Sequence, residues 1–135
     1  MTTSKTRMSL SKYEVGPGIA VSDMKRARAF YEGALGLTPG EVNPGDSGVS
    51  YRCRNSSLHI YPSPHAGKAQ HTQAGWLVDD VDAAVEALTA QGVRFEQYNS
   101  PPIVTDARGI ATFTNGKVAY FKDPDGNIMS LGQVM

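Results

Sequence analysis

This sequence of 135 residues has no excess of charge of one sign, no pair of cysteines and no long apolar run. Thirteen Lys and Arg balance thirteen Asp and Glu, so the chain has no net positive charge that would attract it to nucleic acid or to an anionic membrane. The single cysteine, Cys53, has no partner for an internal disulfide, which suits a reducing compartment. No apolar run approaches the roughly 20 residues of a membrane-spanning helix, and there is no signal-peptide core. We therefore expect a cytoplasmic protein that binds neither nucleic acid nor membranes.

Motifs for several reaction classes are also missing. The sequence contains no Gly-rich phosphate loop, no nucleophile elbow and no paired cysteine motif. Nucleotide hydrolases, serine hydrolases and structural zinc sites depend on these arrangements. The sequence therefore excludes these classes, and the function has to be inferred from the fold and from the residues that the fold brings together.

An internal repeat follows a short polar segment. Residues 1–13 are rich in Ser, Thr and Lys and are predicted to form a flexible tail, whereas residues 14–135 are predicted to form a single domain. The first unit of this domain, about 16–62, has a helix that Asp23 caps and Gly36 ends. Its predicted elements are a strand at 18–21, a helix at 24–34, and strands at 37–42, 49–54 and 58–61, with a turn at 43–46.

The second unit, about 73–132, repeats this order, with Asp80 as the helix cap and Gly92 as the stop. Its predicted elements are a strand at 73–78, a helix at 81–91, strands at 94–98, 111–114, 117–122 and 127–131, and a long loop at 99–109 over the mouth of a cleft. Early in the units the offset is constant: Val21, Asp23, Ala27 and Tyr31 correspond to Val78, Asp80, Ala84 and Leu88, 57 residues later. Further along, residues 49–51 are matched to 118–120 at an offset of 69. Internal repetition is the strongest fold signal in this sequence.

The order of elements predicts the fold class. A helix that separates only the first strand from three others favours helices on one face of a mixed sheet over a doubly wound parallel sheet. We therefore predict an α+β protein of two tandem β-α-β-β-β modules. Placed side by side, their sheets can form a half-barrel whose concave face is a ligand cleft.

Several short motifs carry a resemblance to a known family. They are GIAVSD at 18–23, AFY at 29–31, LGL at 35–37, VDDVD at 78–82 and AYFKDPDGNI at 119–128. With them the chain, from about residue 16 to 131, resembles the vicinal oxygen chelate superfamily of glyoxalases, bleomycin resistance proteins and extradiol dioxygenases. The resemblance implies the fold, because the motifs mark helix caps and hairpin turns, and it implies a homodimer. It does not select one activity.

The resemblance also implies where a metal would be bound. Metal-dependent members of the family place one ligand on the first and one on the last strand of each module, and the corresponding positions here are Gly16, His59, Gln73 and Ser130. A divalent ion needs three or more imidazole or carboxylate donors, and His59 is the one good donor in this set. We therefore expect no metal cofactor. A shift of two residues would put His71 in place of Gln73, which leaves a weak two-histidine site as an alternative.

The remaining candidates follow from strand alternation. His59 lies between Leu58 and Ile60 and is predicted to point into the cleft, where it is the one acid/base candidate among these positions. Tyr61 and Tyr51 are predicted to line the same cavity. Together with Gln73 and Ser130, which the resemblance implies, the predicted ligand-binding residues are His59, Tyr61, Gln73, Ser130 and Tyr51. Trp76 is predicted to face the helices and to belong to the core.

Three hypotheses for function remain. The depleted metal positions favour a metal-free binding protein, either a homodimer or a compact monomer, that takes up a small, partly apolar ligand in its cleft. The alternative is an enzyme, namely a lyase, isomerase or dioxygenase of the same superfamily that uses a residual metal at His59 and His71, or His59 alone as acid or base. A third hypothesis is a partner-binding domain with a vestigial cleft. The number of donors favours the first, and the sequence does not establish catalysis.

Overall fold

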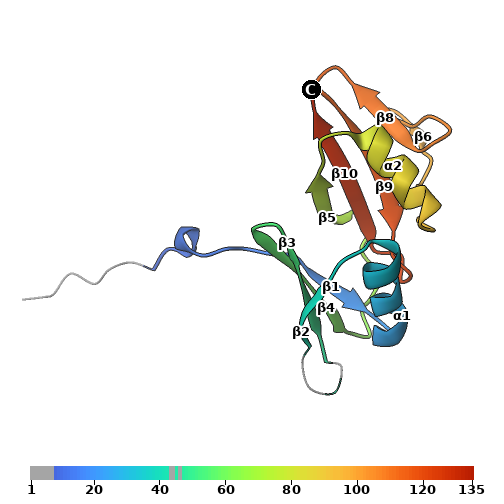
Figure 1. Ribbon diagram of the computed structural model, residues 1–135. Helices are drawn as coiled ribbons and strands as arrows, with labels where there is room; N and C mark the ends of the chain where they lie inside the picture. The colour runs from blue at the N-terminus through green and yellow to red at the C-terminus, as the bar shows by residue number, and fades with distance from the viewer. Residues whose placement is uncertain (1–7, 43–44, 46) are drawn as a thin grey trace, which may run out of the picture.

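The computed structural model describes residues 8–42, 45 and 47–135. In the N-terminal segment a single 3₁₀ turn, η1 (Leu10–Lys12), is followed by extended backbone, and residues 8–16 are all exposed. Figure 1 shows this segment as an arm that projects from the body of the molecule. The first seven residues of the predicted tail lie outside the described part of the chain, as do Asn43, Pro44 and Asp46 of the predicted turn.

The first module confirms the predicted order of elements. It contains β1 (Gly18–Val21), α1 (Met24–Arg28), the π-helix η2 (Ala29–Ala34), β2 (Pro39–Val42), β3 (Val49–Cys53) and β4 (Ser56–Pro62). Asp23 caps α1, since its Oδ1 accepts a hydrogen bond from the N–H of Arg26 at 3.0 Å. The predicted helix is therefore correct in extent, but its second half is wound as a π-helix, which ends where the N–H of Leu35 donates to the carbonyl of Phe30.

The second module repeats the first with one irregular strand. It contains β5 (Thr72–Leu77), α2 (Val81–Ala90), β6 (Asn99–Ser100), β7 (Ile103–Val104), β8 (Ile110–Phe113), β9 (Gly116–Lys122) and β10 (Ile128–Val134). Asp80 caps α2 through the N–H of Ala83 at 3.1 Å. The turn at Asn115 joins β8 to β9 as a hairpin, as predicted.

The predicted strand at 94–98 is wrong. This stretch makes one isolated bridge, from Phe95 to Phe121, and Glu96 donates its N–H to the carbonyl of Tyr120 at 2.8 Å. Phe95 packs against the core and is anchored by its ring contact with Phe121 at 5.6 Å. Side-chain packing therefore holds the segment beside β9, although it does not form a regular ladder. The predicted loop at 99–109 contains the short hairpin β6–β7.

Two four-stranded mixed sheets form the framework. Their strand orders are β1-β4-β3-β2 and β5-β10-β9-β8, and in each the first strand runs parallel to the last strand of its module. Within the described residues the sheets are not joined by strand pairing and do not close into a barrel. β1 and β5 each lie at one edge of their sheet.

A single hydrophobic core spans both modules. It combines buried side chains of β1, β3 and β4 with those of α2, β9 and β10, and the rings of Phe30 and Phe121 meet across the boundary at 6.3 Å. Side chains also bond to the other module's backbone. Asn127 Nδ2 donates to the carbonyl of Ala20 at 2.8 Å, Gln91 Nε2 donates to the carbonyl of Ala34 at 2.8 Å, and Asp125 Oδ2 accepts the N–H of Ser22 at 3.1 Å. These contacts fix the two modules relative to each other.

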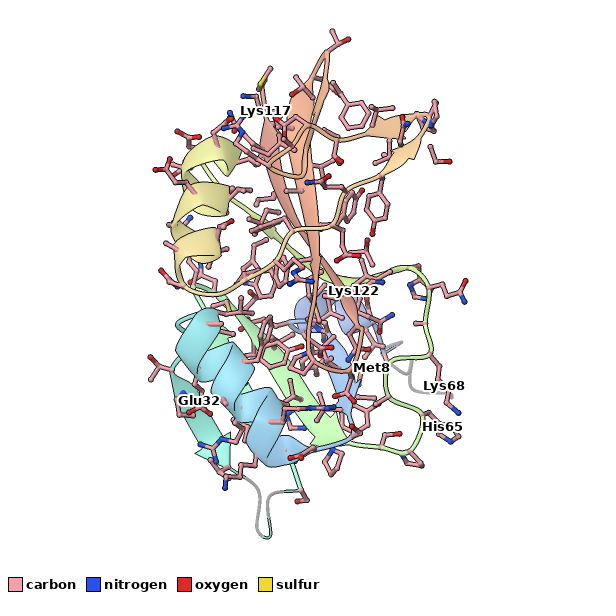
Figure 2. All side chains as sticks on the ribbon, turned by 90° about the vertical axis from the view of Figure 1, so that its right-hand side faces the viewer. Met8, Glu32, His65, Lys68, Lys117 and Lys122 are labelled. Atoms are coloured by element: carbon pink, nitrogen blue, oxygen red, sulfur yellow. The ribbon has the colours of Figure 1, made fainter. Side chains whose placement is uncertain are left out.

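The two helices lie on the same side of the molecule. Figure 2 shows α1 and α2 at the left, with the linker between the modules, marked by His65 and Lys68, at the right. The sheet faces that point away from the helices are called the open faces below. No helix among the described residues is long and apolar enough to cross a membrane.

Candidate functional site

The open face of the second module contains a groove of about 620 Å³, called here the open-face groove. The sheet contributes Tyr120, Lys122 and Ile128, which alternate with residues such as the buried Phe121 that face the helices. The other walls are Tyr98, Ser100 and Ile103 at the β6–β7 hairpin, and Gly67 with residues 69–72 of the linker. The volume lies within the range of small-molecule sites in proteins. The hairpin therefore lies beside the groove, where the sequence placed a loop over a cleft mouth.

An aromatic pair forms one corner of this groove. The rings of Tyr98 and Tyr120 meet edge to face, with centroids 5.7 Å apart and an interplanar angle of 73°. Thr105 holds Tyr98 in place, because its Oγ1 accepts the N–H of Tyr98 at 2.8 Å and its own N–H donates to the Tyr98 carbonyl at 2.9 Å. Both side chains are half-buried, so they offer apolar surface to a ligand without being sealed in the core.

Lys122 places a positive charge beside this aromatic corner. Its Nζ lies 3.5 Å from Oε1 of Glu96, which is a long ion-pair distance, and its side chain is 46% exposed. Burial and the Glu96 carboxylate raise the pKa of Tyr98, so this phenol remains a hydrogen-bond donor at neutral pH. No Asp or Glu is present among the described residues that line the groove.

The linker wall is pressed closely against the turn after β9. Gly67 adopts a φ of +72°, and a Cβ there would lie 1.9 Å from the carbonyl oxygen of Asp125. The carboxylate of Asp125 is itself held by Ser22 and by Arg26, whose Nη2 lies 3.1 Å from Oδ1. Only glycine fits at position 67, so the groove's edge depends on this close approach of two backbones.

His59 and Tyr61 lie on the open face of the first module. Their rings stack at 6.2 Å with an interplanar angle of 15°, and the Ser50 hydroxyl shares a hydrogen bond of 2.9 Å with Nδ1 of His59. His59 is half-buried and Tyr61 is 39% exposed. Neither residue lines the open-face groove of the same chain.

Gln73 and Ser130 lie on the open face of the second module, beside the groove rather than in its wall. Ser130 is opposite Tyr120 in the β9–β10 ladder, and a Cβ on the neighbouring Gly75 would come within 2.4 Å of its Oγ. The Gln73 amide faces His71, with Nε2 3.5 Å from Nδ1 and 3.4 Å from the carbonyl. The structure therefore separates the four family positions into two pairs, one in each module.

The donors at these positions do not fit a divalent metal ion. Gly16 has no side chain, and a Cβ there would lie 2.4 Å from the carbonyl oxygen of Ser57. Gln73 and Ser130 offer neutral oxygens, and His59 alone offers an imidazole. Among the described residues no three His, Cys, Asp or Glu side chains come together in a cluster. Metal sites of this kind require several imidazole or carboxylate donors, and these four positions supply one.

The prediction that Tyr51 lines the cleft is wrong. Tyr51 is fully buried on the helix-facing side, where its hydroxyl donates to Oε2 of Glu32 at 2.9 Å. Strand pairing explains the position of Tyr51, because it is Ser50 that shares a face with His59. His59 pairs with Ser50 and the corresponding Ser130 pairs with Tyr120, so the true offset on this strand is 70 rather than 69. A shift of one residue moves a side chain to the other face of a strand.

One residue of the groove wall, Tyr120, was not predicted. Tyr120 corresponds to Ser50 on the open face, and Tyr51 corresponds to the core residue Phe121. The signal that could have found Tyr120 is its pairing with Ser130 across the turn between β9 and β10. Trp76 was placed correctly, since it packs against the core with its ring 6.2 Å from that of Phe121.

The fold and the open-face groove define a two-module α+β protein with a candidate small-molecule site. Residues 15–131 match the family described as the Glyoxalase/Bleomycin resistance protein/Dioxygenase superfamily. The chain belongs to this superfamily. No curated protein matches the sequence.

Solved structures support the same fold. A glyoxalase/bleomycin resistance protein from Catenulispora acidiphila DSM 44928 is 26% identical with a TM-score of 0.63, covering 90% of this chain and 98% of its own. TnmS3, an antibiotic binding protein from Streptomyces sp. CB03234, is 22% identical with a TM-score of 0.65, covering 97% and 100%. A lactoylglutathione lyase from Agrobacterium tumefaciens is 20% identical with a TM-score of 0.65, covering 90% and 92%. At these identities the last two show the fold alone.

Proposed function

We propose that this protein binds a small, partly apolar organic molecule in the open-face groove without a metal ion. The observation that carries the proposal is the groove itself, in which the rings of Tyr98 and Tyr120 meet at 5.7 Å within a space of about 620 Å³. Half-buried aromatic rings with a few polar groups around them are typical of sites for small organic ligands. The poor donor set at the family's metal positions favours binding over metal-assisted catalysis.

The similarity to an antibiotic binding protein is consistent with this proposal, although that similarity concerns the fold. The similarity to a lactoylglutathione lyase is of the same kind and favours the alternative, a metal-dependent enzyme of the superfamily. The two candidates differ in the donors they require. His59 is the one imidazole at the four positions, and its Nδ1 is engaged by Ser50.

We further propose that the protein works as a homodimer. Leu77, on the edge strand β5, is 83% exposed, and Val15 in the N-terminal arm is 91% exposed. A second copy that covers these side chains would remove apolar surface from water. Light scattering coupled to size-exclusion chromatography should give twice the mass of the 14.5 kDa chain, and Leu77→Lys should lower it to that of a monomer. A monomeric wild-type protein would contradict the dimer.

The binding proposal is tested with a neutral aromatic probe, N-phenyl-1-naphthylamine, whose fluorescence rises in an apolar site. After chelator treatment, the wild-type protein should bind it saturably at one site per chain. Tyr98→Ala should weaken binding about tenfold, because it removes a stacking ring, and Tyr98→Phe should restore most of it. Tyr13→Ala, in the exposed arm, is the matched control and should bind normally. Absence of saturable binding, or equal binding by Tyr98→Ala, would refute the groove as the site.

A further inference from the structure

The charge distribution around the groove carries an inference about the class of ligand, and this inference rests on the proposed function. We propose that the open-face groove selects planar aromatic molecules that carry an anionic group, with the ring against Tyr98 and Tyr120 and the anion beside Lys122. The sequence as a whole gives no reason to expect such selectivity, because its net charge is zero. The selectivity is local and depends on how a few side chains are placed.

Lys122 and Tyr120 are two residues apart on β9, so both side chains project from the open face. Across the ladder from them lie Ile128, opposite Lys122, and Ser130, opposite Tyr120. A planar ligand that stacks on the Tyr120 ring would therefore have the Lys122 ammonium group at one of its ends. An apolar side chain and a hydroxyl lie along its edge. This arrangement matches an aromatic ring that bears one acidic substituent.

The charge on Lys122 is incompletely neutralised. Its contact with Glu96 is 3.5 Å long, and Glu96 lies outside the groove wall. Gly126 also lines the groove, and the acidic residue beside it in the sequence, Asp125, is engaged by Ser22 and Arg26. The groove therefore has a cation in its wall and no carboxylate among its described lining residues. A carboxylate or sulfonate would be attracted here, whereas a cationic ligand would be repelled.

The polar groups on the remaining walls are mostly hydrogen-bond donors or can act as donors. The Tyr98 phenol stays protonated, and Ser100 and Thr72 add hydroxyls to the wall. These groups can satisfy the oxygens of an anion that reaches beyond Lys122. The β6–β7 hairpin supplies Ser100, so a groove lacking this hairpin would bind the anion less tightly.

The experiment compares two probes with the same aromatic skeleton. One is N-phenyl-1-naphthylamine, which is neutral, and the other is 8-anilinonaphthalene-1-sulfonate, which adds a sulfonate to it. We expect the wild-type protein to bind the sulfonate at least threefold more tightly than the neutral probe. Raising the salt from about 0.05 to 0.5 M should weaken the sulfonate alone, because screening acts on the charge.

Three variants locate the effect. Lys122→Met keeps the apolar stem and should weaken the sulfonate about fivefold more than it weakens the neutral probe. Glu96→Gln removes the competing carboxylate and should tighten the sulfonate about threefold, which a purely structural role for Glu96 would not do. Lys25→Met removes the same charge from the exposed surface of α1 and should change neither probe.

The outcomes separate the inference from the function it rests on. Suppose that both probes bind saturably and that Tyr98→Ala weakens both. Equal affinities for the two probes, or a Lys122→Met variant that behaves as wild type, would then overturn the anion selectivity and leave the binding function standing. If neither probe binds saturably, or if Tyr98→Ala leaves the binding of both probes unchanged, the inference and the proposed function fail together. Preference for the sulfonate that disappears in Lys122→Met and persists in Lys25→Met supports the inference.

Discussion

The hydroxyl of Tyr31 donates a hydrogen bond of 2.8 Å to Oδ2 of Asp123, and both residues are buried. Tyr31 lies on η2 of the first module, whereas Asp123 begins the turn between β9 and β10 of the second. The same carboxylate accepts the N–H groups of Asp125 and Asn127 at 2.9 Å and the Asn127 amide at 2.8 Å. One charged group therefore organises the turn and ties it to the other module.

Tyr31→Phe should lower the free energy of unfolding by about 2 kcal/mol, because it removes a hydrogen bond to a buried carboxylate without changing the volume of the ring. Urea unfolding measures the change. Tyr13→Phe is the control, since Tyr13 is 58% exposed in the N-terminal arm, and it should be neutral. Equal free energies of unfolding for wild type and Tyr31→Phe would show that this hydrogen bond between the modules does not stabilise the fold.

Stability should fall at alkaline pH. Burial and the Asp123 carboxylate raise the pKa of Tyr31, and burial and Glu32 raise the pKa of Tyr51. An unfolded tyrosine ionises near pH 10, so above that pH the folded state binds more protons than the unfolded state. Each of the two phenols should then remove about 1.4 kcal/mol of stability per pH unit above about 10, and none below it. Urea unfolding between pH 8 and about 11.5 should show a shallower decline for Tyr31→Phe, and an identical decline would contradict the assignment.

Two glycines with the same backbone angle provide a matched test of the groove's edge. Gly36 and Gly67 both have a φ of +72°, but a Cβ on Gly36 meets nothing within 4 Å, whereas one on Gly67 meets the Asp125 carbonyl. Gly36→Ala should cost about 1–2 kcal/mol from the left-handed conformation alone. Gly67→Ala should cost at least about 2 kcal/mol more, because the linker must move away from the turn. It should also weaken binding of the naphthylamine probe. Equal losses of stability would show that the two backbones are not in contact.

Divalent metals should not stabilise the protein specifically. Titration of chelator-treated protein with Zn²⁺, Ni²⁺, Mn²⁺ or Fe²⁺ should give no saturable rise in Tm, because a single imidazole does not hold these ions tightly. His59→Ala should respond as the wild type does. A stoichiometric metal, or a saturable rise that His59→Ala abolishes, would redirect the search to lyase or dioxygenase substrates.

Local signals predicted the framework of this protein well. Asp23 and Asp80 cap the two helices, and the turn at Asn115 joins β8 to β9, because capping and turn formation depend on residues close in sequence. The stretch at 94–98 behaved differently. Phe95 is held by its contact with Phe121, a tertiary contact that no local pattern contains. Its position beside β9 therefore could not be read from the sequence.

The candidate site was predicted only in part. Alternation around His59 placed it on the open face of the first module, as the structure shows, whereas Ser130 was proposed from the family resemblance. Tyr120 was missed and Tyr51 was misplaced because the face that each side chain takes depends on pairing with the neighbouring strand. Ser50, not Tyr51, pairs with His59, and Tyr120 pairs with Ser130. Tyr98 lies outside any regular strand, and its position in the groove wall depends on Thr105, which folds back onto it.

The most direct test of the account is a crystal structure of chelator-treated protein grown with N-phenyl-1-naphthylamine. The account predicts the probe in the open-face groove, with its naphthalene ring against Tyr98 and Tyr120 and no metal ion bound by His59. A probe bound elsewhere on the molecule, or a metal ion held by His59 with ligands from a second copy, would contradict it.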